Sequence, residues 1–192
     1  IDDLKGKRIL ELGGGHGDIG AFLASLGAEV LTLDGRMKNV NFAKLKHRKV
    51  ESFSCTRFNL EKDFSEFGRF DIIINFGLVY HLENVDQHLQ YCFKMADDIL
   101  FESVVCDSED PYKIFYCKGN EAIDEEALEG TGCRPSPFYI ERIAGENNFE
   151  VIRHFSSDLN SGNQFVYDWK PSKKERLGDN FRLRRFWRFK KT

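Results

Sequence analysis

Four glycines and a carboxylate near the start of the sequence have the types and spacing of a nucleoside-binding turn. Gly13, Gly14, Gly15 and Gly17 directly follow an apolar run. Glycine lets a backbone turn sharply and approach a ligand closely, because no Cβ intervenes. Asp34 ends the next apolar run, about 20 residues downstream, where folds of this kind bind ribose hydroxyls. The pattern predicts half of a strand–helix–strand unit that binds a nucleoside cofactor.

Two classes of cofactor fit these glycines. Residues 15–20 match the dinucleotide pattern Gly-x-Gly-x-x-Gly, a short motif that is weak on its own. The apolar strand, however, ends at Leu12, which places the turn at 13–17 and puts Glu11 two residues before it. A carboxylate at that place repels a pyrophosphate and attracts an ammonium or sulfonium group. We therefore favour a cationic cofactor.

His81 is the candidate general base. It lies just past the fourth apolar run, at the edge where open α/β sheets bind ligands. Its unperturbed pKa of about 6.5 lets it accept a proton at neutral pH. The alternative is a histidine at a helix start that bonds only to backbone. His16 either contacts the cofactor or faces solvent, and we interpret His47, His88 and His154, which fall on predicted regular elements, as structural.

Two longer segments resemble the class I S-adenosylmethionine-dependent methyltransferases. Residues 11–17, Glu-x-Gly-x-Gly-x-Gly, match the first motif of that family, and Asp34 matches the acidic residue that ends its second strand. Residues 70–82, Phe-Asp-Ile-Ile-Ile-Asn-Phe-Gly-Leu-Val-Tyr-His-Leu, resemble the fourth motif of its small-molecule branch. The family normally has Asp at the position of Asn59, where Asn offers a hydrogen bond without a charge.

The resemblance implies S-adenosyl-L-methionine as the cofactor, and we expect no metal site. It assigns these cofactor contacts: Glu11, Gly13, Gly14 and Gly15 at the methionine part, Asp34 at the ribose, Gly35 and Arg36 beside the adenosine, Asn59 and Leu60 at the adenine edge, and Asn75 and Phe76 near the methionine ammonium. For Asp34 the alternative is a cap for the helix that starts near Arg36.

Two residues are candidates for contact with the methyl acceptor. Tyr80 precedes His81 and either lines the acceptor pocket or simply packs as an aromatic ring. Arg134 is placed to clamp a carboxylate or phosphate of an acceptor. The nearby acidic run Asp107, Glu109 and Asp110 has the composition of a hard-cation site. We interpret that run as a solvated loop, because no matching set of ligands occurs elsewhere.

Alternating strand and helix patterns predict an α/β fold around these residues. Apolar runs and apolar residues at helical spacing recur in the order strand, helix, strand as far as residue 105. The right-handed crossover rule then builds a parallel sheet with helices on both faces. The predicted strands are 7–12, 28–33, 49–58, 68–76 and 98–105, and the predicted helices are 18–26, 36–48, 84–96 and 136–148.

Two further segments complete the predicted domain. Residues 106–134 are acidic and lack periodicity, so we interpret them as a loop with short helical pieces that forms a lid. Strands 149–155 and 164–169 are expected to pair antiparallel and resemble the last two strands of the methyltransferase sheet. We expect one domain over 1–170, with a doubly wound, mostly parallel seven-stranded sheet, and a basic aromatic tail over 171–192.

The net charge of −3 conceals an uneven distribution. Residues 169–192 carry +8, which leaves −11 on residues 1–168. An acidic body argues against broad nucleic-acid binding by the domain. The tail mixes bases with aromatics, as RNA-binding and membrane-surface segments do, although a terminal charge run is usually a solvated end.

Cysteine usage and hydropathy indicate the compartment. The five cysteines form no Cys-x-x-Cys pair, so we interpret them as reduced thiols and not as a zinc site. No apolar run approaches the roughly 18 residues that span a bilayer, and no charged-then-apolar leader precedes the first strand. We expect a cytoplasmic protein, and we expect further residues upstream of Ile1, because the first strand begins almost at once.

The favoured function is methyl transfer to an oxygen or nitrogen of a small molecule or sugar. One alternative is an RNA or protein methyltransferase that is anchored by the basic tail. Others are a non-catalytic cofactor-binding subunit and a nicotinamide-dependent reductase built on the same half-fold. The acceptor itself is not specified by any motif.

Overall fold

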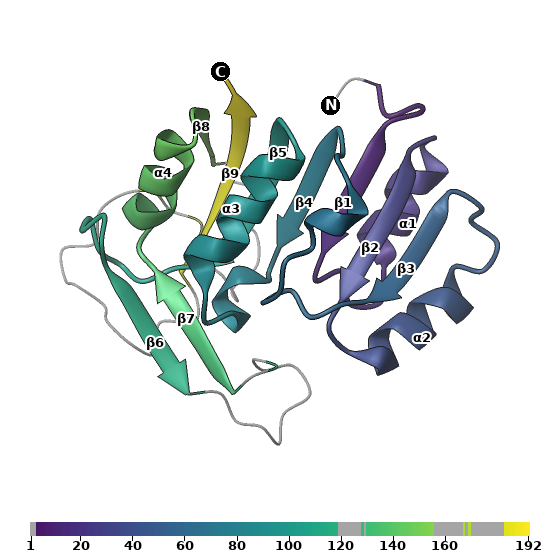
Figure 1. Ribbon diagram of the computed structural model, residues 1–192, viewed down its shortest axis with the longest axis horizontal. Coiled ribbons are helices and arrows are strands. Elements are labelled where there is room, and N and C mark those ends of the chain that lie inside the picture. The colour runs from purple at the N-terminus through teal and green to yellow at the C-terminus, as the bar shows by residue number, and fades with distance from the viewer. Residues whose placement is uncertain (1–2, 119–127, 129, 156–166, 168, 170–182) are drawn as a thin grey trace.

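A seven-stranded sheet in the order β3-β2-β1-β4-β5-β9-β8 forms the centre of the molecule (Figure 1). The computed structural model describes residues 3–118, 128, 130–155, 167, 169 and 183–192. The strands of the sheet are β1 (Arg8–Leu12), β2 (Glu29–Asp34), β3 (Phe53–Arg57), β4 (Ile72–Phe76), β5 (Asp98–Val104), β8 (Phe149–His154) and β9 (Arg184–Lys191). Strands β1 to β5 pair in parallel, and β9 is antiparallel to both of its neighbours.

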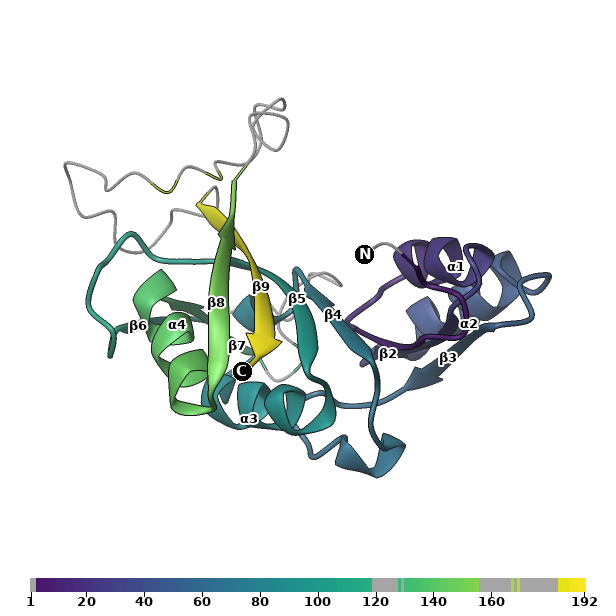
Figure 2. The same cartoon turned by 90° about the horizontal axis from the view of Figure 1, so that it is seen from above.

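Helices cover both faces of this sheet, which confirms the predicted doubly wound α/β fold (Figure 2). On one side lie α1 (Asp18–Ser25) and α2 (Met37–Lys46), and on the other lie α3 (Val85–Met95) and α4 (Pro137–Glu146). A 3₁₀ turn, Val79–His81, connects β4 toward α3. No helix in the described ranges combines the length and apolarity needed to cross a membrane.

The register of the central strands brings their carboxyl ends to one level. Leu12 of β1 is paired with Leu33 of β2 on one side and with Asn75 of β4 on the other. Whatever follows these three residues therefore emerges at the same edge of the sheet. The glycine turn, Asp34 and the turn after β4 are neighbours for this reason.

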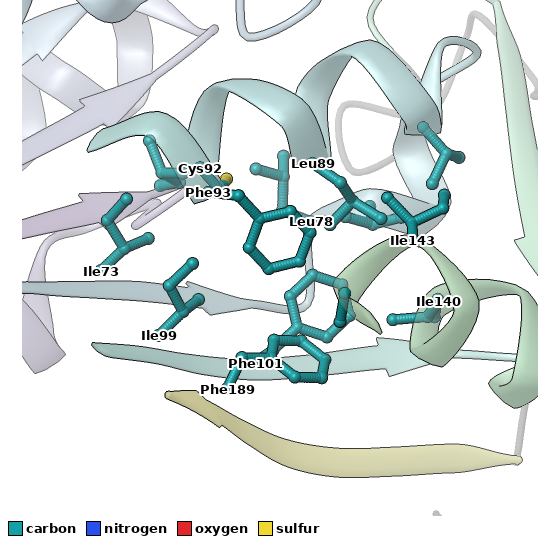
Figure 3. Packing of buried hydrophobic residues seen from close by; sticks show 14 of the residues in the cluster. Ile73, Leu78, Leu89, Cys92, Phe93, Ile99, Phe101, Ile140, Ile143 and Phe189 are labelled. Carbon is teal, nitrogen blue, oxygen red and sulfur yellow. The ribbon is translucent and has the colours of Figure 1, made fainter. Parts of the chain in front are cut away.

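The largest core cluster lies between the sheet and helices α3 and α4 (Figure 3). Alternate residues of the strands point into it, because successive side chains of a strand face opposite sides. From β4, β5 and β9 these include Ile73, Ile99, Phe101 and Phe189, and from the helices they include Leu89, Cys92, Phe93, Ile140 and Ile143. Helix α4 begins where Ser136 accepts a hydrogen bond from the Tyr139 backbone N–H at 3.0 Å, as the Ser-Pro pair predicts.

Residues 184–191 of the expected basic tail form strand β9, which lies between β5 and β8 in the sheet. Trp187 and Phe189 are fully buried, while Arg184, Arg188 and Lys190 occupy the alternate positions, on the opposite face of the sheet. Arg188 pairs with Asp98 at 2.5 Å. Strand β8 pairs antiparallel with β9, and the predicted strand 164–169 lies outside the described residues except for Tyr167 and Trp169. The domain therefore includes residues 184–191, and the expected boundary at 170 was wrong.

The segment after β5 also differs from the expectation. Within 106–134 we expected short helical pieces, but its described part contains β6 (Ile114–Lys118) and β7 (Thr131–Pro135), which pair antiparallel as a separate two-stranded sheet. Strand β7 packs closely on the 3₁₀ turn, since a Cβ on Gly132 would lie 2.5 Å from the Tyr80 carbonyl oxygen. The segment is thus anchored beside the turn that carries His81.

Strand β9 gives the first testable prediction. We expect Trp187→Ala to lower the free energy of unfolding by about 3–5 kcal/mol, because it empties a fully buried aromatic site. Urea unfolding followed by circular dichroism measures the change. The control is Tyr112→Ala, an exposed aromatic residue, which should change the stability little. A Trp187→Ala variant as stable as the wild type would contradict the placement of β9 in the core.

Candidate functional site

A cavity of about 790 Å³ opens at the carboxyl ends of the central strands. Its volume is within the range of small-molecule sites, about 300–1,000 Å³. The glycine turn, the β2–α2 junction, the loop after β3 and the turn after β4 all contribute to its walls, and Leu128 contributes from the β6–β7 connection. The predicted residues that line it are Gly13, Gly15, Asp34, Gly35, Arg36, Asn59, Leu60 and His81. The other predicted residues are not part of its lining: Glu11, Gly14, Asn75, Phe76, Tyr80 and Arg134.

The Glu11 carboxylate lies directly behind the glycine turn. Its side chain is 3% exposed, and its Oε2 accepts a hydrogen bond from the Thr32 hydroxyl at 2.5 Å. A Cβ on Gly14 would lie 2.5 Å from that oxygen, so only glycine lets the turn pass this close. Burial raises the pKa of Glu11 to about 7, although hydrogen bonds from Thr32 and from the Gly20 backbone act to lower it. The carboxylate therefore supports the turn from behind.

Asp34 connects the glycine turn to the start of α2. Its Oδ2 accepts a hydrogen bond from the Gly15 N–H at 2.9 Å, and its Oδ1 accepts from the Arg36 N–H at 2.8 Å and from Asn39 Nδ2 at 3.1 Å. The carboxylate also lines the cavity. The two interpretations of Asp34, ligand contact and support for the helix start, are thus compatible in one side chain.

The loop after β3 is fixed to the interior of the protein by a histidine. The Leu60 carbonyl lies 3.1 Å from Nδ1 of His88, whose Nε2 lies 2.9 Å from Nδ2 of Asn75. Asn75 therefore points its side chain toward α3, below the cavity. Burial lowers the pKa of His88 to about 4, against the opposing effect of the Leu60 hydrogen bond, so the ring is neutral at neutral pH.

The turn after β4 presents an aromatic pair and a charged pair. The rings of Tyr80 and His81 are 4.2 Å apart, and His81 lines the cavity. The Tyr80 hydroxyl accepts a hydrogen bond from Arg184 Nη2 at 3.0 Å, and Arg184 Nη1 is 2.9 Å from both carboxylate oxygens of Glu102. Burial raises the pKa of Glu102, while Arg184 opposes that shift.

This charged pair borders the cavity at Gly77. A Cβ on Gly77 would lie 3.5 Å from the Tyr80 hydroxyl and 3.9 Å from Nη1 of Arg184 and from Oε2 of Glu102. Gly77 itself lines the cavity. Glu102 and Arg184 could not be predicted from the sequence, because they are 82 residues apart and meet only when β9 pairs with β5.

Two predicted site residues have contacts that differ from their expected roles. Arg134 Nη1 donates hydrogen bonds to the carbonyls of Tyr80 at 2.9 Å and Cys133 at 2.7 Å, which holds β7 against the 3₁₀ turn. The ring of Phe76 packs on that of Phe186 at 5.0 Å. The clamp on an acceptor anion and the contact with a methionine ammonium stay predictions. In the described ranges, no group of three His, Cys, Asp or Glu side chains is arranged to hold a metal ion.

The buried His88 predicts a dependence of stability on pH. Its pKa in the folded protein lies below the ordinary value of 6.5. The unfolded chain therefore binds the proton more strongly, and the contribution of His88 to stability is lost as the pH falls from about 6.5 to about 4. We expect this loss to be smaller by about 3 kcal/mol in His88→Gln, measured by urea unfolding across that range. His154→Gln, at an exposed histidine, should leave the loss unchanged, and an equal loss in all three proteins would contradict the prediction.

Part of the chain matches a known family in sequence. Residues 10–98 match the family model described as "Methyltransferase domain". The ubiquinone biosynthesis O-methyltransferases of Mesorhizobium japonicum and Agrobacterium fabrum are each 33% identical to this chain, over 93 and 94 residues respectively. The alignments cover 48% of this chain and 37% and 38% of those proteins. The chain thus spans less than two fifths of the length of these curated relatives.

Solved structures extend the likeness of the fold to nearly the whole chain. The N-terminal domain of EvdMO1, crystallised with SAH, has a TM-score of 0.76 at 18% identity, with 97% of this chain and 74% of that chain covered. Magnesium protoporphyrin IX methyltransferase from Synechocystis PCC 6803, with bound SAM, has a TM-score of 0.64 at 16% identity, with 98% and 72% covered. The sequence match over residues 10–98 and the fold confirm the resemblance to the class I, Rossmann-like methyltransferases, the family that uses S-adenosylmethionine as its cofactor.

Proposed function

We propose that this protein transfers a methyl group from S-adenosylmethionine to an oxygen of a small molecule or sugar. The observation that carries the proposal is the convergence of Asp34, the glycine turn, the loop at Asn59 and Leu60, and His81 on one cavity. The names of the matched relatives support an O-methyltransferase. EvdMO1, whose N-terminal domain was also crystallised in the presence of SAH and D-fucose, supports a sugar among the candidate acceptors.

The residues of the cavity fit the proposed cofactor. The Asp34 carboxylate is placed at the end of β2 for the ribose hydroxyls, and apolar side chains of Leu60, Leu78, Leu82 and Leu128 offer surfaces for the adenine. Gly13 and Gly15 of the glycine turn line the cavity, where their backbone is available for the methionine part of the cofactor. Glu11 contributes a negative charge behind the turn when it is ionised, which favours a cationic ligand over a pyrophosphate.

The chemistry follows from alignment. The bound cofactor supplies an electrophilic methyl group, so the protein has to hold the acceptor in line with it and exclude water. His81, at the rim of the cavity, takes the proton from the acceptor hydroxyl. We place the acceptor beside Gly77, where the Tyr80 hydroxyl is held by Arg184 and has no acceptor for its own proton among the described residues.

The RNA and protein alternative depended on a free basic tail. Arg184 and Arg188 form ion pairs with Glu102 and Asp98, and Trp187 is buried in the sheet. The described part of that segment thus contributes to the domain itself. Residues 170–182 lie outside the described ranges. We retain the small-molecule proposal.

Cofactor choice is tested by calorimetric titration. We expect S-adenosylhomocysteine to bind and NADH not to bind. Asp34→Asn should weaken the binding at least about tenfold, because it removes the negative charge from a hydrogen-bond acceptor at the cavity wall. The control Asp97→Asn removes a carboxylate that pairs with Arg69 and lies outside the cavity lining, and it should bind like the wild type. Binding of NADH alone would favour the reductase.

The role of His81 is tested by turnover. With tritiated S-adenosylmethionine and a panel of phenols, catechols and sugars, we expect His81→Ala to lower kcat about 100-fold on whichever acceptor the wild type methylates. The dissociation constant for S-adenosylhomocysteine should change little, because the imidazole acts on the acceptor. The control is His154→Ala, on the exposed end of β8. Equal kcat values for the wild type and His81→Ala would refute the role.

A further inference from the structure

His88, in the middle of α3, is buried and takes no part in the proposed chemistry. It is 1% exposed, and its ring packs against Phe64 at 5.3 Å between centroids. Both ring nitrogens have partners, the Leu60 carbonyl at 3.1 Å and Asn75 Nδ2 at 2.9 Å. An amide nitrogen only donates, so Nε2 accepts from Asn75 and Nδ1 carries the proton that it donates to Leu60.

The two partners belong to different walls of the site. Leu60 lines the cavity in the loop that the family resemblance places at the adenine. Asn75 lies in β4, two residues before Gly77, and is paired with Leu12 of β1 directly before the glycine turn. A single imidazole ring thus sets the distance between the loop after β3 and the centre of the sheet.

A second contact holds the same loop to the same helix. The Glu61 carboxylate accepts hydrogen bonds from the backbone N–H groups of Glu83 at 2.6 Å and Asn84 at 3.2 Å, where α3 begins. Leu89 and Phe93 fasten α3 to the core. A loop fixed by a rigid element needs less ordering when a ligand binds, which improves affinity.

The geometry points to His88 as a positioning residue for the cofactor. The Nδ1–H of His88 donates a hydrogen bond to the Leu60 carbonyl. This bond keeps the adenine side of the cavity in the conformation that binds the cofactor. This inference rests on the proposed function, because it takes S-adenosylmethionine as the ligand. A hydrogen bond inside the protein is stronger than one in water. If the donor of His88 is lost, the carbonyl of the buried Leu60 has no partner, and the loop has to move to give it one.

Two conservative variants separate the two hydrogen bonds. The amide of His88→Asn reaches the place of Nδ1 and keeps the donor to Leu60, whereas the amide of His88→Gln reaches the place of Nε2 and keeps the contact with Asn75. We expect the dissociation constant for S-adenosylhomocysteine to rise five- to tenfold in His88→Gln and less than threefold in His88→Asn. Adenosine alone should show the same difference, because the effect lies on the adenine side. Calorimetry measures both ligands, and thermal unfolding shows that each variant is folded.

Two further variants make the test decisive. Tyr139→Phe removes the hydrogen bond that joins α4 to Asp86 of α3 and leaves the loop untouched, so it should bind both ligands like the wild type. Glu61→Gln, at the second contact, should weaken adenosine binding even where a His88 variant fails to fold. Equal affinities of His88→Asn and His88→Gln would overturn the inference, as would an equal loss in Tyr139→Phe. A wild type that binds neither ligand would instead overturn the proposed function.

Discussion

The hydrogen bonds of the Asp34 carboxylate hold the cofactor cavity together. One oxygen holds the glycine turn at Gly15, and the other holds the start of α2 at Arg36 and Asn39. A carboxylate accepts about four hydrogen bonds, and three are formed within the protein. Under the proposed function, a ribose that presents two hydroxyls to Asp34 would have to replace one of these hydrogen bonds, and the side chain of Asn39 is the partner that can move with the least disturbance of the backbone. The same two carboxylate oxygens of Asp34 thus stabilise the fold and line the cavity.

Two buried titratable groups near the cavity oppose each other. Glu11, with its pKa raised from 4.5 to about 7, contributes stability that is present at low pH and is lost as the pH rises through 7. His88, with its pKa lowered from 6.5 to about 4, contributes stability in the opposite direction. Between about pH 4.5 and 6.5, the changes of these two contributions with pH have opposite signs and largely cancel. Both arise from burial beside the cavity, one behind the glycine turn and one below the loop at Leu60.

Local patterns were enough to predict most of the parallel half of the molecule. The helical spacing of Val85, Leu89 and Cys92 predicted α3, and Ser136 with Pro137 predicted the start of α4, because each feature depends on neighbours within one turn. The glycine turn, Asp34 and His81 were also predicted, because each belongs to a short sequence motif. These residues do meet at one cavity.

Strand β9 could not be predicted from the sequence, because its pattern depends on distant partners. Arg184 and Arg188 alternate with buried aromatics, and such a run has the composition of a solvated basic end. The carboxylates that pair with these cations, Glu102 and Asp98, are 82 and 90 residues away. The contacts of His88 with Leu60 and Asn75 likewise span 28 and 13 residues and appear only in the folded chain.

The place of β9 between β5 and β8 has a consequence for synthesis on the ribosome. Strands β1 to β5 emerge long before β9, so they can pair while the outer edge of β5 lacks its neighbour. Strand β8 has no described partner besides β9, so it also stays unpaired until β9 has been synthesised. Unpaired edges attract other chains, and joining strands so distant in sequence is slow. The nascent protein therefore forms the walls of its cavity early, and it depends on protection from aggregation until its last described strand is made.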